Sequence, residues 1–171
     1  MQQVRSARTL GVSRMSDEVI GTISASMGRR VLGIASLALL GFLLIYVSFT
    51  QPPAILGQVF LLAIGSASLW IADKMRRATA TVIELTASEL RDSSGELICT
   101  LDDIESIDRG FFAFKPSNGF LLRLKSPGTR SWRPGLWWRS GRRIGIGGMT
   151  PGQQTKFVSE IIAVTLAQRD L

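Results

Sequence analysis

The side chains best suited to recognition chemistry lie close together in the stretch SWRPGLWWRSGRR, residues 131–143. This Trp/Arg stretch holds three of the chain's four tryptophans and four arginines, and it contains no acidic residue. Tryptophan and arginine are enriched at the energetic centres of protein interfaces, and arginine also pairs with phosphate oxygens. We therefore expect a surface for a protein partner or a lipid headgroup, formed by Trp132, Arg133, Trp137, Trp138, Arg139, Arg142 and Arg143.

The Trp/Arg stretch lies in a region that the sequence predicts to be irregular. Prolines and glycines interrupt residues 126–141, namely Pro127, Gly128, Pro134, Gly135 and Gly141. The sequence therefore predicts a long loop between two strands, and long loops in compact domains often carry function. Its tryptophans could lie at a membrane–water interface, in a contact with another protein, or over the domain's own core. Residues 111–114, FFAF, could join any of these surfaces or alternate within a strand.

Catalytic chemistry has few candidate residues in this chain. The sequence contains no histidine, which excludes a histidine-based triad, a histidine zinc site and a histidine general base. Cys99 is the single cysteine, so no internal disulfide or cysteine cluster can form. It lies in the apolar segment LICTL, which predicts a buried structural thiol.

Two further patterns resemble functional motifs only in part. An acidic group comprises Asp102, Asp103, Glu105 and Asp108, but its spacing does not fit an EF-hand, and a charged loop explains it. Residues 145–148, GIGG, precede a helix but lack the Lys-Ser/Thr pair of a phosphate-binding loop. We therefore expect a protein that is not an enzyme and that uses no metal or cofactor.

Charge is strongly basic overall and is divided along the chain. The formal net charge is +7 and the pI is near 10.7, which favours a polyanionic partner. Residues 84–108 hold eight acidic residues and one basic residue, whereas residues 109–156 hold ten basic and no acidic residues. The basic half could face an anionic membrane, or acids and bases could pair across strands. We expect no nucleic-acid partner, because the sequence carries no recognisable nucleic-acid-binding motif.

An apolar region precedes these charged segments. Residues 31–72 are 42 consecutive residues without a charge, broken by TQPPA at residues 50–54. The two runs on either side, residues 31–49 and 55–72, are each close to the ~20 residues needed to cross a bilayer. A secretory signal has a shorter apolar core of ~7–15 residues, and neither run shows the amphipathic face of a soluble helix. The sequence therefore predicts a transmembrane helical hairpin.

The flanks of the two runs predict their orientation. Basic residues lie at the ends joined to the rest of the chain, and the Pro-Pro turn carries no charge, so the positive-inside rule places both termini in the cytoplasm. Tyr46 and Trp70 fall near opposite ends of the spans, where interfacial aromatic side chains belong. The basic residues that flank the membrane are Arg29, Arg30, Lys74, Arg76 and Arg77.

Three segments follow from this division: a flexible basic arm at residues 1–15, a helical hairpin at 16–77, and a cytoplasmic domain at 78–171. Ser16 resembles a helix N-cap, with Asp17 and Glu18 in the first turn. The sequence therefore predicts a helix that begins near residue 16 and continues into the first span.

The last 94 residues alternate strand-like runs with turn signals. Ile104 and Ile107 are candidate core residues, Thr150 and Pro151 are the expected cap and first residue of a closing helix, and its apolar side is expected to hold Phe157, Ile161, Val164 and Leu166. The fold class predicted is an α+β membrane protein: a transmembrane α-hairpin, then a small antiparallel β roll or barrel capped by a C-terminal helix. The strands are expected at residues 81–85, after ASEL, at 97–101, from 102–114, at 120–124 and at 142–148, with turns at 92–96 and 116–119.

The segments VIELTASELR, LICTLDDIESI and FLLRL, followed by the closing helix, resemble the bacterial PH-like domain. That domain is found on small bacterial membrane proteins, usually beside two transmembrane helices, so the resemblance implies a PH-like fold at the bacterial inner membrane. Phosphoinositide-binding PH domains carry a basic cluster in the loop after their first strand. Here the corresponding segment, LTASELRDSS, has Arg91 alone among Glu89 and Asp92, so we do not expect that mode of recognition.

Together these features predict a non-enzymatic integral inner-membrane protein. We expect an accessory, assembly or stabilising subunit of a larger membrane complex, which docks through its spans and the Trp/Arg stretch. The alternative is a self-contained module whose PH-like domain binds the anionic inner leaflet. The expected partners are therefore anionic lipids of the bilayer and other membrane-protein subunits.

Overall fold

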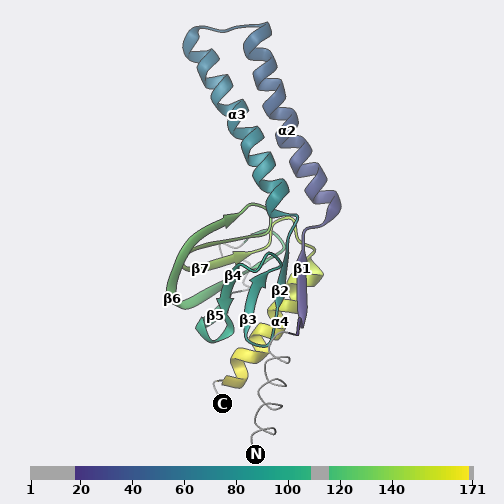
Figure 1. The fold of residues 1–171 in the computed structure, drawn as a ribbon, viewed down its shortest axis with the longest axis vertical. Coiled ribbons are helices and arrows are strands. Elements are labelled where there is room, and N and C mark those ends of the chain that lie inside the picture. Colours follow the sequence, from purple (N-terminus) through teal and green to yellow (C-terminus); the bar gives the residue numbers. More distant parts are fainter. Residues whose placement is uncertain (1–17, 109–115, 170–171) are drawn as a thin grey trace, which may run out of the picture.

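Two long antiparallel helices rise from a domain of two antiparallel sheets (Figure 1) in a computed structural model that describes residues 18–108 and 116–169. The helices are α2 (Met27–Thr50) and α3 (Ile55–Ala78). The break between them falls at Pro52 and Pro53, as predicted, and both helices are longer than the apolar runs. The expected arm, Ser16, Asp17 and residues 111–114 lie outside the described residues.

Glycine sets how closely the two helices of this helical hairpin approach. A Cβ at Gly41 would lie 2.9 Å from the Gly65 carbonyl oxygen, and one at Gly65 would lie 3.0 Å from the Gly41 carbonyl oxygen. The backbones therefore touch where neither residue has a side chain, which is the usual geometry of small residues between apolar helices. Most other side chains of the pair point away from the molecule.

The helix predicted to begin near residue 16 begins instead at Met27. Strand β1 (Gly21–Ser24) precedes it and pairs with β2 (Val82–Leu85), Ser24 lying opposite Val82. The helical hairpin is thus inserted between two neighbouring strands. The β domain, comprising both sheets and the final helix, includes a strand from before the helices as well as chain after residue 78.

The first sheet has the strand order β1-β2-β3-β4, where β3 is Glu89–Asp92 and β4 is Leu97–Thr100. A short 3-10 helix, Leu101–Asp103, leads into the second sheet, β5-β6-β7. Its strands are β5 (Ile104–Asp108), β6 (Phe120–Arg133) and β7 (Trp137–Ile146), and every neighbouring pair is antiparallel. The turns predicted at residues 92–96 and 116–119 both form.

The final helix α4 (Gly152–Arg169) closes the core with a different face from the one predicted. Val158 and Ile162 are fully buried, whereas Phe157 and Val164 are exposed. The reason is the unpredicted strand β1, which packs on α4 so that a Cβ at Gly21 would lie 3.1 Å from Val158. Ile161 and Leu166 pack partly against the core, and Ile104 and Ile107 contribute to it as predicted.

Thr150 does not cap α4 as the sequence suggested. Its hydroxyl group is buried and has no hydrogen-bond partner, and the helix begins at Gly152 rather than at Pro151. Arg29 binds the Thr150 carbonyl oxygen instead, at 3.1 Å from Nη1. This hydrogen bond from Arg29 to Thr150 therefore connects the first turn of α2 to the start of α4.

The expected loop at residues 126–141 is a continuous β-hairpin. Strands β6 and β7 flank a tight turn at 134–136, and Gly128 pairs with Gly141 between two shifts of register. These bulges admit the proline and glycines that suggested irregular structure. The hairpin curls until its turn meets the chain after β7, where the Met149 amide donates to the Gly135 carbonyl at 2.9 Å. Figure 1 shows this curl as the long arc of β6.

Candidate functional site at the foot of the helical hairpin

The β-hairpin separates the residues of the Trp/Arg stretch. Trp137 is 1% exposed and belongs to the core, so it is not part of an outer recognition surface. Arg133 binds the Glu96 carboxylate through Nε, at 3.2 Å, and through Nη2. Arg139 donates to the Ile98 carbonyl at 2.8 Å and to the Thr129 carbonyl at 2.6 Å. These three side chains hold the β domain together.

The other members remain at the surface in two separate places. Trp132 and Trp138 lie opposite each other across β6 and β7. Trp132 is 45% exposed, while Trp138 is half-buried and its ring covers Gly145. Arg142 and Arg143 are exposed further along β7, beyond the bend at Gly141. The stretch therefore does not form the single surface that the sequence suggested.

An aromatic and cationic cluster joins α3 to β6. The Lys74 ammonium lies 5.0 Å from the centre of the Trp70 ring and 4.6 Å from the centre of the Trp132 ring. Trp70 and Lys74 are one helical turn apart on α3, and β6 brings Trp132 to them. A cation over an aromatic face contributes roughly 0.5–1 kcal/mol when exposed and more when desolvated. The sequence analysis assigned Trp132 to the Trp/Arg stretch, and Trp70 and Lys74 to the end of the second span. The four-residue spacing of Trp70 and Lys74 is the part of this cluster that the sequence alone contains.

The other basic residues that flank the helices already have partners. Arg76 and Arg77 share Asp73, at 2.9 and 2.5 Å. Arg30 donates to the Arg76 carbonyl oxygen at 3.4 Å, and Arg29 binds near the start of α4 as described. Within residues 18–108 and 116–169, by contrast, Lys74 has no ion pair with an acidic side chain.

The helical hairpin is packed firmly on the β domain at its foot, which we define as the cluster of Trp70, Lys74 and Trp132 together with Ser26, Gly33, Thr79, Gly135 and Met149. The Ser26 amide donates to the Met149 carbonyl at 2.8 Å. A Cβ at Gly33 would lie 2.3 Å from Met149 Cε, and one at Gly135 would lie 3.2 Å from Thr79 Cγ2. Contacts from both helices and from the β6–β7 turn therefore fix the domain relative to the hairpin.

A cavity of about 430 Å³ opens beside this foot. Trp132, Trp137 and Trp138 all line it, together with backbone from Gly135 and Gly148. The Trp137 indole N–H is buried and has no hydrogen-bond acceptor. Buried polar groups are nearly always hydrogen-bonded, so a donor without a partner beside a cavity is unusual.

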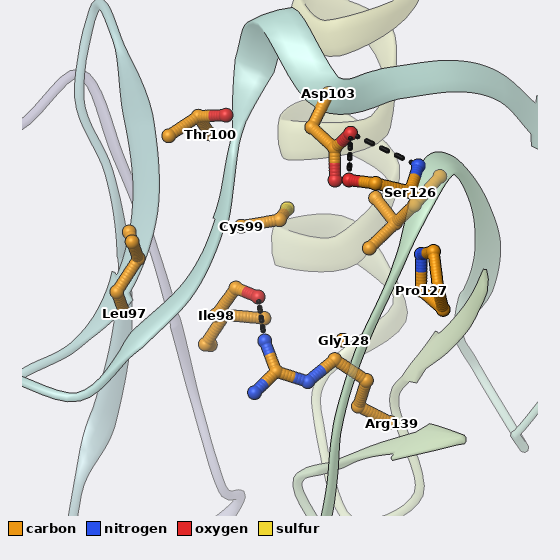
Figure 2. A pocket seen from close by; sticks show the side chains of 10 residues that line it. Leu97, Ile98, Cys99, Thr100, Asp103, Ser126, Pro127, Gly128 and Arg139 are labelled. Carbon is orange, nitrogen blue, oxygen red and sulfur yellow. Dashed lines mark hydrogen bonds between the residues drawn. The ribbon is translucent and has the colours of Figure 1, made fainter. Parts of the chain in front are cut away.

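A second cavity, of about 350 Å³, lies between β4 and the β6–β7 hairpin (Figure 2). Arg139 crosses it to reach the Ile98 carbonyl, and Asp103 accepts hydrogen bonds from the Ser126 amide and hydroxyl at 3.1 and 2.6 Å. Burial raises the pKa of the Cys99 thiol to about 12, with a further contribution from Asp103. The thiol is therefore protonated and unreactive at neutral pH, so it does not supply a nucleophile to this cavity.

Acidic and basic halves of the sequence meet within the β domain. Arg133 of β6 binds Glu96, which precedes β4, and Arg123 Nε of β6 lies 3.2 Å from Glu105 of the neighbouring strand β5. These pairs support cross-strand pairing, the second of the two interpretations of the charge division. The described part of the chain contains no group of three or more acidic or cysteine side chains placed to hold a metal ion.

With this geometry established, comparison with known proteins adds no relative. No protein-family model, curated protein or solved structure matches the chain. Function is therefore inferred from the residues at the foot, above all Trp70, Lys74 and Trp132. These side chains join α3 to the β domain and remain partly exposed.

Proposed function

We propose that the chain is a non-enzymatic integral protein of the bacterial inner membrane, whose β domain rests on the cytoplasmic leaflet. The two helices support membrane insertion, with mean hydropathies of 2.4 and 1.9 over segments that are only 11% and 17% buried within the molecule. A helix in the core of a soluble protein would be mostly covered. Apolar surface of this extent would be costly in water and is suited to lipid.

The single observation that carries the contact with the leaflet is the cluster of Trp70, Lys74 and Trp132. The charge-free part of α3, residues 55–72, spans about 27 Å at ~1.5 Å per residue, close to the ~30 Å of bilayer hydrocarbon. Lys74 therefore lies among the lipid headgroups, with Trp70 one turn deeper at the edge of the hydrocarbon. Tryptophan and lysine side chains prefer this layer. Because Trp132 belongs to the β domain, its contact with Lys74 brings that domain to the same depth.

The two-sheet architecture with a final helix also supports the resemblance to PH-like domains, which we retain as part of the proposal. Strand β1 changes one inference drawn from it. With Gly21–Ser24 as the first strand, the segment after that strand is the helical hairpin and not LTASELRDSS. The region that carries the basic cluster in phosphoinositide-binding PH domains is therefore an anchor here. Contact with lipid falls instead to the foot.

Depth-dependent fluorescence quenching tests this proposal. The full chain is placed in bilayers whose lipids carry bromine near the headgroup, because cutting at residue 78 would remove β1 from the sheet. We expect bromine at this depth to quench the wild-type chain more than the Trp132→Phe variant. Trp137→Phe is the matched control, since that ring is 1% exposed and lies in the core. Equal quenching of wild type and Trp132→Phe would show that the β domain stands away from the leaflet.

A second candidate function is a subunit of a larger membrane complex. One surface favours it: the side of α4 that the core does not use. Phe157 and Val164 are exposed there and line a hollow of about 310 Å³ together with Glu160, Thr165 and the outer part of Ile161. Gentle solubilisation followed by size analysis separates the two functions. Migration as a single 18.7 kDa chain would count against a complex, whereas a larger assembly dissolved by Phe157→Ser would favour it.

A further inference from the structure

We propose that the cavity lined by Trp132, Trp137 and Trp138 binds the headgroup of one anionic glycerophospholipid, with Lys74 as the partner of its phosphate. The inference rests on the proposed membrane location and adds a ligand and a binding site to it. The lipid comes from the cytoplasmic leaflet. Its phosphate lies beside Lys74, which contacts Trp132 but does not itself line the cavity, and the terminal glycerol of the headgroup enters the cavity. Its acyl chains stay among the neighbouring lipids.

The position of the cavity is the first argument. Trp132 forms part of the cavity wall and also lies against Lys74, near the end of α3. Gly135, on the same wall, packs against Thr79 directly after that helix. A cavity at this position is level with the headgroups and can be reached by a lipid that stays in the leaflet.

The unpaired cation is the second argument. Lys74 is held between two aromatic rings but has no acidic partner among the described residues. A phosphate placed beside Trp132 gives this ammonium a counter-charge.

The balance of charge specifies the class of lipid. Arg133 also lines the cavity, but Glu96 already neutralises it. Among the described residues of the cavity lining Arg133 is the one cation, so Lys74 beside the cavity is the described cation at this position that lacks an acidic partner, which matches a phosphodiester with a single negative charge. An inositol lipid with several phosphates would need a cluster of basic residues. The volume of about 430 Å³ is within the usual range for small-ligand sites, and the aromatic walls suit a glycerol unit.

Lipid retention measured by native mass spectrometry tests the site. The full chain is released from nanodiscs that contain equal amounts of phosphatidylglycerol and phosphatidylcholine. We expect wild type to retain phosphatidylglycerol about tenfold over phosphatidylcholine, as one charge-assisted contact implies. Lys74→Gln should bring this ratio close to one, and Trp138→Leu should lower the retention of both lipids. The matched control is the double variant Arg142→Gln, Arg143→Gln, which removes two exposed cations outside the cavity and should keep the wild-type ratio.

Three outcomes would overturn the assignment. A ratio unchanged by Lys74→Gln would exclude Lys74 as the phosphate partner, and a ratio lost in the Arg142/Arg143 control would indicate general attraction to a charged surface. Displacement of the retained lipid by millimolar glycerol 3-phosphate or inorganic phosphate would assign the site to a free phosphate. The quenching experiment separates failure of this site from failure of the membrane proposal. If brominated lipid quenches Trp132 but the protein retains both lipids equally, the lipid site is rejected and the membrane location stands.

Discussion

The molecule contains two long hairpins that meet at the foot and differ in the burial of their large apolar side chains. In the helical hairpin, Leu39, Phe42 and Phe60 point outward and are exposed. In the β6–β7 hairpin, Trp137, Ile144 and Ile146 point inward and are fully buried. The residues of the helical hairpin are the more apolar, yet it contributes little to the core of the molecule.

The difference follows from where each hairpin finds its hydrogen bonds and its cover. Each helix satisfies its backbone internally, so its side chains are free to face an apolar surrounding. A strand needs a neighbouring strand for its backbone hydrogen bonds and a core on one face, so β6 and β7 pair with each other and curl around side chains from the rest of the β domain. In the proposed membrane location lipid covers the helical hairpin, whereas the β-hairpin is covered by the remainder of the chain.

Replacement of Trp137 by alanine should produce the largest loss of stability. The ring lies in the core, and truncation of a buried large aromatic side chain to alanine costs about 3–5 kcal/mol. Urea denaturation of the full chain in detergent measures the free energy of unfolding of the β domain. Trp132→Ala is the matched control, because it removes an exposed ring worth roughly 1 kcal/mol in its contact with Lys74. Equal losses for the two variants would mean that the β6–β7 hairpin does not place Trp137 inside the core and Trp132 outside it as described.

These two tryptophans also show what could be read from the sequence. The composition predicts the helical hairpin and its turn at Pro52 and Pro53, because two long apolar runs without charge are typical of a pair of long apolar helices. It could not assign Trp132 outward and Trp137 inward, because they are only five residues apart and their fates depend on the register of β6 with β7. Pro127 and Gly128 predict a loop, because both residues are uncommon within strands. In the structure, bulges between β6 and β7 accommodate them within the sheet.

Strand β1 was missed for a related reason. Four residues that pair with a strand almost sixty residues later, beyond two helices, leave no local signal. That omission also misplaced the buried face of α4, since the helix packs on β1. The contact of Trp132 with Lys74 likewise depends on two elements distant in sequence, so the foot was not predicted as a unit.

A charge placed at the centre of α2 should produce the next largest effect. Leu39 is 70% exposed near the middle of the helix, and arginine at the centre of a membrane helix costs about 2.5–3.5 kcal/mol on insertion scales. The measurement is the fraction of Leu39→Arg found in the membrane pellet after carbonate extraction. Leu97→Arg is the control, because this exposed leucine lies on the β domain and its replacement should change stability by only about 0.5 kcal/mol. Full membrane recovery of Leu39→Arg would argue that lipid does not surround this helix.

Two arginines of the β-hairpin, Arg139 and Arg142, should differ in how much their replacement by alanine lowers stability. Arg139→Ala leaves the Ile98 and Thr129 carbonyl oxygens without their donor, which costs about 1–3 kcal/mol where water cannot replace it. Arg142→Ala, three residues further along β7, removes an exposed side chain and should change stability by about 0.5 kcal/mol or less. Both values come from urea denaturation in detergent. If Arg142→Ala proved as costly as Arg139→Ala, the division of the Trp/Arg stretch into inward and outward members would be wrong.

The smallest effect concerns the closure of the core around Cys99. Its pKa is raised from 9.0 to about 12 by burial, so above pH 9 the unfolded chain loses the thiol proton while the folded chain retains it. The unfolded state is then favoured, and the free energy of unfolding should fall by on the order of 1 kcal/mol between pH 9 and pH 10, with no contribution at neutral pH. Cys99→Ala provides the reference profile, since other groups titrate in this range and only the thiol differs. Parallel profiles for the two proteins would show that water reaches the thiol, and that the cavity in Figure 2 is open rather than closed by Arg139.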